Sequence, residues 1–336
     1  MSPTEPQTTD PDRTINVRGR PRAYLDRLRI RRRDYYLLQK IGSPFRERYL
    51  AFDPLQGPGG DFALVQRWAK SANSDQFLRV LRKLKDDAFP RVCEWQPREG
   101  GFDVALTWVE GISLFDYFEH LRTQRRPPVD PGQAVRLIQG LAHGICKLHH
   151  KSQVAHGDLQ PANVVLTSHP SRLVLIDFGS AWGMQAAAFR VDGDGHHRCY
   201  AAPELQCAGI PDGFLADQFS VSVLLFQLLT QQLPFGGLGG KAGRPEYVAA
   251  SADALVPPSR LSRACANLPQ SLRDGVDRVT TRGLALDPAQ RYPDRHAWLD
   301  DLFAISARFR ISPELPPLES ALTRVIQWFV NRTQRK

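Results

Sequence analysis

Apolar residues gather in short runs in the first third of the chain. Each run is bounded by Gly, Pro or Asp, which is typical of strands between turns. The five runs are Tyr35–Ile41, Arg48–Phe52, Phe62–Trp68, Arg91–Gln96 and Phe102–Val109. Between the third and fourth, apolar residues recur at i, i+3, i+4 and i+7, which predicts a helix over 74–86. Residues 34–110 are therefore expected to form a five-stranded antiparallel sheet lobe with one helix.

Longer segments with helical spacing or helix caps follow in residues 111–306. The predicted helices are Leu114–Arg125, Pro131–Lys151, Ala216–Leu229, Leu272–Leu286 and Tyr292–Ile305. Only two strand-like runs interrupt them, Asn163–Leu166 and Arg172–Ile176. The whole pattern predicts an α+β fold with a small sheet lobe followed by a larger, mainly helical lobe.

The two ends of the chain differ from this pattern. Residues 1–33 begin with Pro, Thr, Asp and Gln and continue with arginines, so we expect a disordered basic arm. Because few aromatic residues are interleaved, no specific nucleic acid is expected as its partner, and a solvated leader is favoured over binding to an acidic surface. The tail, 307–336, is predicted to carry an amphipathic helix that docks on its own domain or meets a partner or a membrane surface. The apolar stripe of this helix is Leu318, Ala321, Leu322, Val325, Trp328 and Phe329.

Composition agrees with a soluble globular protein, with 42% apolar and 24% charged residues. No apolar stretch approaches the roughly 20 residues of a membrane helix, and the N-terminus has no signal-peptide pattern. Five scattered cysteines without a CxxC pair indicate reduced thiols. We therefore expect a cytoplasmic protein without a transmembrane segment.

Five short motifs occur in one order along the chain. They are His156–Asn163, Asp177–Gly179, Tyr200–Glu204, Asp217–Ser220 and Leu286–Arg291. They resemble, in that order, the catalytic loop, the metal-binding loop, the Ala-Pro-Glu motif, the start of the large buried helix and the late arginine motif of protein kinases. Each string is weak evidence alone, but five in this order are strong evidence, and the resemblance as a whole spans about residues 34–306. The resemblance to serine/threonine protein kinases implies the two-lobed kinase fold.

The resemblance also implies the roles of individual residues. Asp158 would be the catalytic base, and Asn163 and Asp177 would complete the catalytic set. Asn163 and Asp177 would also hold the Mg²⁺ ions that bridge the phosphates of ATP. Taken singly, Asp158 and Asp177 are also compatible with simple turn residues. The other positions matching the nucleotide site are Gly42, Arg46, Ala63 and Leu106.

The resemblance further implies structural roles outside the site. Glu204 and Arg291 would form a buried ion pair that fixes the activation segment to the helical lobe. Asp217 would accept backbone N–H groups of the catalytic loop. For Arg291 the alternative is a solvated cation at a helix end.

The sheet lobe departs from the family pattern. Aligned with Val-Ala-Ile-Lys, the third strand places Val65 where kinases have the lysine that anchors ATP, and the helix places Val80 where its glutamate partner belongs. No Glu occurs from Ser71 to Arg91, so a shifted register does not restore the pair. Two valines can pack together where one unpaired charge would be costly, so we expect an apolar contact between Val65 and Val80.

The phosphate-covering hairpin keeps one glycine, Gly42, and Pro44 removes a backbone donor. In the with-no-lysine kinases this hairpin supplies the missing cation, and Arg46 follows at a similar place. Arg46 and Arg48 share one face of a strand by alternation, although two solvated arginines are the simpler interpretation. Lys70 is a further candidate.

Substrate contacts also differ from the family pattern. Gln160 replaces the lysine usual in serine/threonine kinases, and Gly157 replaces the arginine that reads a phosphate on the activation loop. Between Gly179 and Tyr200 only Ser180 offers a hydroxyl, so switching by loop phosphorylation is not expected.

Three functions are compatible with these residues. The first is ATP- and Mg²⁺-dependent phosphoryl transfer to Ser or Thr of a protein substrate, with the usual Lys–Glu anchor missing. The second is a pseudokinase that binds nucleotide or a protein partner as a scaffold. The third is a small-molecule phosphotransferase, because the string His156–Leu159 also resembles aminoglycoside and choline kinases.

Overall fold

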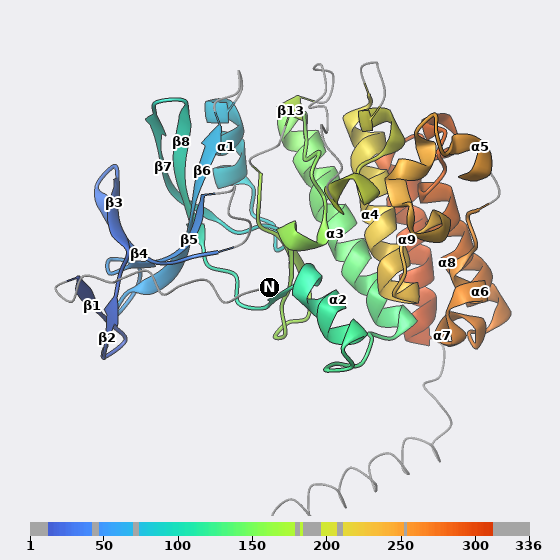
Figure 1. Ribbon diagram of the computed structural model, residues 1–336, viewed down its shortest axis with the longest axis horizontal. Helices are drawn as coiled ribbons and strands as arrows, with labels where there is room; N and C mark the ends of the chain where they lie inside the picture. The colour runs from blue at the N-terminus through green and yellow to red at the C-terminus, as the bar shows by residue number, and fades with distance from the viewer. Residues whose placement is uncertain are drawn as a thin grey trace, which may run out of the picture.

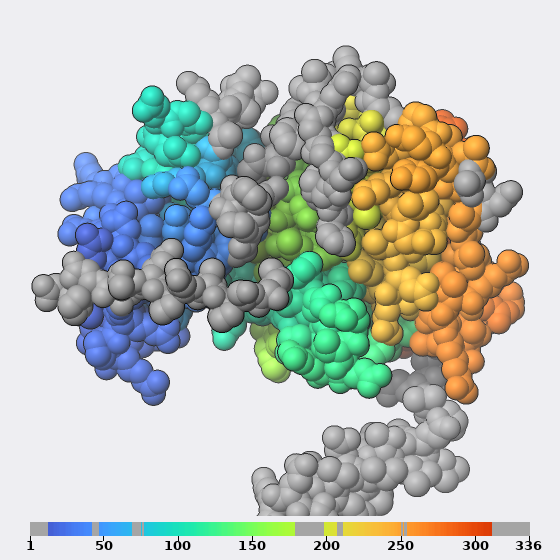
Figure 2. All heavy atoms as spheres, in the orientation of Figure 1, coloured from blue at the N-terminus to red at the C-terminus, as the bar shows by residue number. Residues whose placement is uncertain are grey.

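The computed structural model describes residues 13–41, 47–69, 74–178, 182–183, 196–206, 211–251 and 254–311. It shows a sheet lobe at one end and a helical lobe at the other (Figure 1). In a space-filling view the sheet lobe runs from blue to cyan and the helical lobe from green to orange (Figure 2). One apolar core cluster includes residues of both lobes, among them Leu64 and Leu81 of the first and Leu141 of the second.

The sheet of the first lobe has six antiparallel strands in the order β3-β4-β5-β6-β8-β7. Their bounds are β3 (Asp26–Ile30), β4 (Arg33–Lys40), β5 (Arg48–Asp53), β6 (Asp61–Ala69), β7 (Val92–Arg98) and β8 (Gly101–Thr107). All five predicted strands are present, and helix α1 (Ser74–Lys83) follows β6. The sixth strand, β3, comes from the segment that was expected to be a disordered arm.

The prediction of disorder is therefore wrong for residues 14–30, which form β3 and a hairpin of β1 (Thr14–Val17) and β2 (Arg20–Ala23). Several arginines in this part of the chain contact the sheet lobe. Arg18 forms an ion pair with Asp61 at 2.9 Å and stacks 5.1 Å from the centroid of the Phe62 ring. Arg31 stacks 5.0 Å from the Trp95 ring and donates to its backbone oxygen. Such cation–π contacts give the arginines a structural partner that a charge count cannot show.

The two faces of the sheet bury different sets of side chains. Val65 lies in a small cluster with Ile30, Tyr35, Leu37, Ala51, Ala63 and Ala105. The alternate residues Leu64 and Trp68 lie in the main core with Phe77, Leu78 and Leu81 of α1. Since neighbouring residues of a strand point to opposite faces, Val65 points away from the face that α1 covers.

The expected contact between Val65 and Val80 is corrected by this arrangement. No residue of α1 belongs to the described cluster around Val65, and Val80 is half-buried on α1 itself. The residues of β6 on the face that α1 covers include Leu64 and Trp68, and a displacement of one residue in a strand exchanges the two faces.

The second lobe is built on five principal helices. They are α2 (Leu114–Arg122), α3 (Pro131–Ser152), α4 (Gly213–Thr230), α8 (Gln270–Gly283) and α9 (Arg295–Ile311). Polar caps fix three of their starts: the side chains of Ser113, Asp130 and Asp212 accept backbone N–H groups of the first turns of α2, α3 and α4. Three shorter helices, α5 (Val248–Ser251), α6 (Pro258–Leu261) and α7 (Arg263–Ala266), lie between α4 and α8.

Within the described residues, α4 is the one helix long and apolar enough to cross a membrane, and 89% of it is buried inside the protein. It is packed as the central helix of the second lobe (Figure 1). A small sheet of β9 (Ile112–Ser113), β11 (Val164–Leu166) and β12 (Leu173–Leu175), in the order β12-β11-β9, lies against α2 and α3. The turn that holds the candidate catalytic residues precedes β11, and Asp177 follows β12.

Candidate active site

Asp217 on α4 holds the backbone of the predicted catalytic loop. Its carboxylate accepts the N–H groups of His156 at 2.7 Å and Gly157 at 2.9 Å, and it lies 2.7 Å from Nε2 of His149. Burial alone would raise the pKa of the Asp217 carboxyl, but the His149 hydrogen bond, the charges of His149 and His156 and the Gly157 N–H outweigh burial and lower it. The expected anchoring of the loop by Asp217 is present.

Asp158 is oriented by two amide side chains. Gln160 Nε2 donates to Asp158 Oδ1 at 2.6 Å, and Asn163 Nδ2 donates to Asp158 Oδ2 at 2.9 Å. Asn163 Nδ2 also donates to the Asp158 backbone oxygen at 2.8 Å. Asp158 is half-buried, and both of its carboxylate oxygens are held. This gives the carboxylate the fixed direction that a general base needs.

Asp177 and Asn163 both contact Arg48, which lies on β5 in the other lobe. Arg48 Nη2 donates to Asn163 Oδ1 at 2.8 Å and forms a short ion pair with Asp177 Oδ2. All three residues are buried, with exposed fractions of 6% for Arg48, 1% for Asn163 and 5% for Asp177. Arg48 was expected to be a solvated surface arginine, and that interpretation is wrong.

Gln66 is the strand residue that faces the site. It pairs directly with Arg48 in the β5–β6 ladder and shares its face of the sheet. Gln66 Nε2 donates to the Ile176 backbone oxygen at 2.9 Å, and Gln66 Oε1 accepts from Trp68 Nε1 at 2.9 Å. The strand position that faces the metal-binding loop is thus a neutral amide with both ends hydrogen-bonded.

Phe178 joins α1 to the site through aromatic packing. Its ring centroid lies 5.9 Å from Phe77 of α1, 6.2 Å from Trp68 of β6 and 5.5 Å from Phe89. The ring of His156 lies 5.4 Å away, edge to face. Such ring pairs add roughly 0.5–1.5 kcal/mol each beyond burial. Aromatic contacts therefore fix α1 against the loop that carries Asp177 and Phe178.

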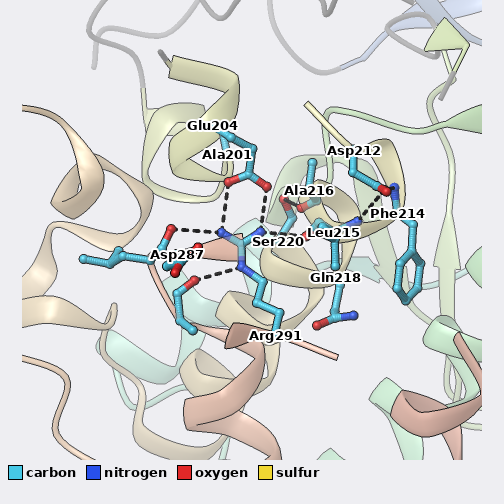
Figure 3. A network of polar contacts seen from close by, with 12 residues as sticks. Ala201, Glu204, Asp212, Phe214, Leu215, Ala216, Gln218, Ser220, Asp287 and Arg291 are labelled. Carbon is cyan, nitrogen blue, oxygen red and sulfur yellow. Dashed lines mark hydrogen bonds and ion pairs between the residues drawn. The ribbon is translucent and has the colours of Figure 1, made fainter. Parts of the chain in front are cut away.

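The buried ion pair predicted between Glu204 and Arg291 is present. Arg291 Nη1 and Nη2 bind the two Glu204 oxygens at 2.6 and 2.9 Å (Figure 3). Arg291 is fully buried, donates to the backbone oxygens of Ala285 and Leu215 at 2.8 and 2.9 Å, and stacks 4.8 Å from the Phe219 ring. The paired guanidinium joins η3 (Pro203–Gln206), which carries Glu204, to α4 and to the turn before α9.

The structure brings Asp158, Asn163 and Asp177 together through the contacts above. Leu106 is buried on the same face of the sheet as Leu64, its partner in the ladder, and therefore on the face of Gln66. Ala63 lies with Val65 in the cluster on the opposite face, and its expected contact with nucleotide stays a prediction. Gly42 and Arg46 lie outside the described residues, as does Lys70.

Sequence reasoning did not identify Gln66 as a residue of the site, and it favoured a solvated position for Arg48. Strict alternation from Leu64 and Trp68, the large apolar residues, would have assigned Gln66 to their face. Among the described residues no group of three His, Cys, Asp or Glu side chains is placed to hold a metal. The pair Asn163–Asp177 is thus the candidate oxygen site that the geometry offers.

Comparisons with known proteins agree with this fold. The family model described as protein kinase domain matches residues 70–297. Serine/threonine-protein kinase PknI of Mycobacterium tuberculosis is 30% identical over 271 residues, which are 77% of this chain and 39% of PknI. Serine/threonine-protein kinase PrkC of Bacillus subtilis is 24% identical over 232 residues, 66% of this chain and 33% of PrkC.

This chain therefore spans about a third to two fifths of those relatives. The crystal structure of the M. tuberculosis PknI kinase domain has the same fold, with a TM-score of 0.55 and 22% identity over 83% of this chain and 98% of that chain. The family match begins after β6, so the strand that carries Arg48 lies in the divergent part of the chain. The chain belongs to the protein kinase family.

Proposed function

We propose that this protein binds ATP and transfers its terminal phosphoryl group to a serine or threonine hydroxyl of a protein substrate. The observation that carries the proposal is the convergence of Asp158, Asn163 and Asp177, with both oxygens of Asp158 held by amide donors. Phosphoryl transfer depends on positioning and charge neutralisation, and these three side chains match those needs.

In this proposal Asp158 orients the substrate hydroxyl and accepts its proton. Gln160 stands where the family has a lysine, so it holds Asp158 without adding positive charge to the phosphates. The loss of one cation at about 4 Å costs roughly 4 kcal/mol at an effective dielectric of 20. Slow turnover is therefore part of the proposal.

Mg²⁺ fits the chemistry of the donor set. Asn163 Oδ1 and Asp177 Oδ2 both contact the same nitrogen of Arg48, so the two oxygens converge on one point and prefer a cation there. Amide and carboxylate oxygens are ligands for hard divalent ions. Asn163 and Asp177 would hold the metal, which when bound neutralises phosphate charge.

A pseudokinase is the second candidate, and one observation favours it. The metal-site oxygens are already paired with Arg48, and the strand position beside them is the neutral Gln66. Such a protein would bind a partner, with or without nucleotide, and transfer no phosphate. A small-molecule phosphotransferase is less favoured, because the Glu204–Arg291 pair and the family match are features of protein kinases.

A protein substrate or partner and a cytoplasmic location complete the proposal. The cysteines among the described residues, Cys93, Cys146, Cys199 and Cys265, are free, which agrees with a reducing compartment. The amphipathic tail segment proposed as a partner contact lies outside the described residues.

A paired assay on wild type and Asp177→Asn tests the proposal. Thermal shift with ATP and Mg²⁺ reports binding, and labelled-phosphate transfer to the protein itself and to a generic basic protein reports chemistry. ATP binding and phosphate transfer by wild type, with transfer lost in Asp177→Asn, would support the enzyme. A shift without transfer selects the pseudokinase, and neither signal leaves a scaffold.

A further inference from the structure

Arg48 occupies the oxygens that the proposed function assigns to metal. Its Nη2 contacts Asn163 Oδ1 and Asp177 Oδ2 together, so a single nitrogen lies between the two candidate ligands. A guanidinium and a divalent ion cannot share that position, because both are cations and both need the same lone pairs.

Two other arginines at this end of the sheet, among the residues that the structure describes, are engaged elsewhere. Arg67 pairs with Glu47 at 2.7 Å and with Asp103 at 3.3 Å, and Arg98 pairs with Asp103 at 3.5 Å. Neither makes a described contact with Asn163 or Asp177. Arg48 is thus the arginine of the described sheet that contacts the metal-binding loop.

The guanidinium of Arg48 is also incompletely satisfied. Its Nε is buried and has no hydrogen-bond partner among the described residues. A buried donor without an acceptor costs about 1–3 kcal/mol, so the pairing with Asp177 leaves the side chain able to gain by meeting another acceptor. Phosphate oxygens are preferred partners of a guanidinium, which binds them through several N–H groups at once.

We propose that Arg48 is a built-in cation that competes with divalent metal for Asn163 and Asp177, and that, once displaced, it serves as the phosphate-binding cation in place of the strand lysine. This inference rests on the proposed function of the same site. In the metal-free protein Arg48 neutralises Asp177. When metal is held by the two oxygens, the guanidinium is released on the face of the sheet it shares with Gln66.

Binding of Mn²⁺ alone to the full chain tests the competition, with free Mn²⁺ measured by electron paramagnetic resonance. Arg48→Gln removes the competing charge, and Arg98→Gln, which removes a 36% exposed arginine of the same sheet, is the matched control. We expect Arg48→Gln to bind Mn²⁺ at least about tenfold more tightly than wild type, the effect of about 1.4 kcal/mol. Arg98→Gln should match wild type. Equal or weaker binding by Arg48→Gln, or no binding by either protein, would overturn the inference.

A measurement on wild type covers the case in which Arg48→Gln does not fold. Phenylglyoxal modifies exposed arginines, and peptide mass mapping gives the rate at each position. Arg48 should react slowly without metal, because it is buried, and several-fold faster with Mn²⁺. An unchanged or lower rate at Arg48 with Mn²⁺ would contradict displacement.

Phosphate transfer in the same samples separates the two proposals. Phosphoryl transfer without competition between Arg48 and Mn²⁺ would refute the inference and support the proposed function. Competition between Arg48 and Mn²⁺ without phosphoryl transfer would support the inference and refute the proposed chemistry.

Discussion

Arg48 and Asp177 lie 129 positions apart in the chain and form a buried ion pair between the sheet lobe and the metal-binding loop. In the proposal above, Arg48 of β5 supplies the positive charge that protein kinases place on the third strand. Gln66, opposite Arg48 in the ladder, fills the position that faces the same loop.

Two lysine substitutions test which strand residue faces the site. Val65→Lys would bury an unpaired charge in the apolar cluster with Tyr35 and Leu37 and should cost about 3–5 kcal/mol of unfolding free energy. Gln66→Lys would keep a donor for the Ile176 oxygen but lose the acceptor of the Trp68 N–H. Because its charge would lie on the face where Arg48 meets Asp177, it should cost less stability than Val65→Lys and bind ATP about tenfold more tightly. Chemical denaturation and ATP thermal shift measure both effects. The opposite pattern, with Val65→Lys stable and improved in ATP binding, would refute the assigned faces.

Gln160→Lys restores the charge that the family has beside the catalytic base. A cation near the phosphates contributes up to roughly 4 kcal/mol at 4 Å and an effective dielectric of 20. We expect phosphoryl transfer to rise at least about tenfold, which needs about 1.4 kcal/mol. Gln160→Leu, which loses the 2.6 Å bond to Asp158, should lower transfer. Initial rates with labelled ATP measure this, and a slower Gln160→Lys would count against the role of Asp158.

Arg291→Gln should lower the unfolding free energy by about 3–5 kcal/mol, because Glu204 would keep a charge without its bidentate partner. Urea denaturation measures the change. The matched control is Arg122→Gln, which breaks an exposed pair with Glu119 at 2.7 Å and should change stability by less than about 1 kcal/mol. Equal effects of the two substitutions would mean that the Glu204–Arg291 pair contributes no more than a surface pair.

Acid should weaken the anchoring of the catalytic loop by Asp217. The folded-state pKa of Asp217 lies below its ordinary value of 3.8, so its contribution to stability is full above that pH and is lost as pH falls through the folded pKa. Unfolding free energies of wild type and Asp217→Asn should therefore differ most near neutral pH and converge as the pH falls below about 4. A difference that stays constant down to the lowest pH at which wild type folds would show that Asp217 is not held ionised.

The pattern of apolar residues was sufficient for much of this fold. Alternation and turn residues predict the five sheet strands, and helical spacing with caps predicts the principal helices. The motif strings also predict the Glu204–Arg291 pair, since both partners lie in strings of the family.

Three features depend on contacts that the sequence pattern does not contain. The strands in residues 14–30 carry few apolar side chains, and Arg18 and Arg31 reach Phe62 and Trp95 far along the chain. The strand that carries Val65 has apolar residues on both faces. Its pattern therefore does not show which of two neighbouring residues faces α1. Arg48 is buried together with Asp177 of the other lobe. The sequence around Arg48 does not reveal this distant partner, so it predicts a solvent-exposed arginine.

Phosphoryl transfer by Asp158→Asn, measured together with ATP binding, tests the central claim most directly. Asn keeps the size of the side chain and an acceptor for one amide donor, so the loop should stay folded and ATP binding should remain within about threefold of wild type, below 1.4 kcal/mol. Transfer should fall at least about a hundredfold, the lower range for loss of a general base. Transfer equal to that of wild type would contradict the assignment of Asp158, Asn163 and Asp177 as a phosphotransfer site.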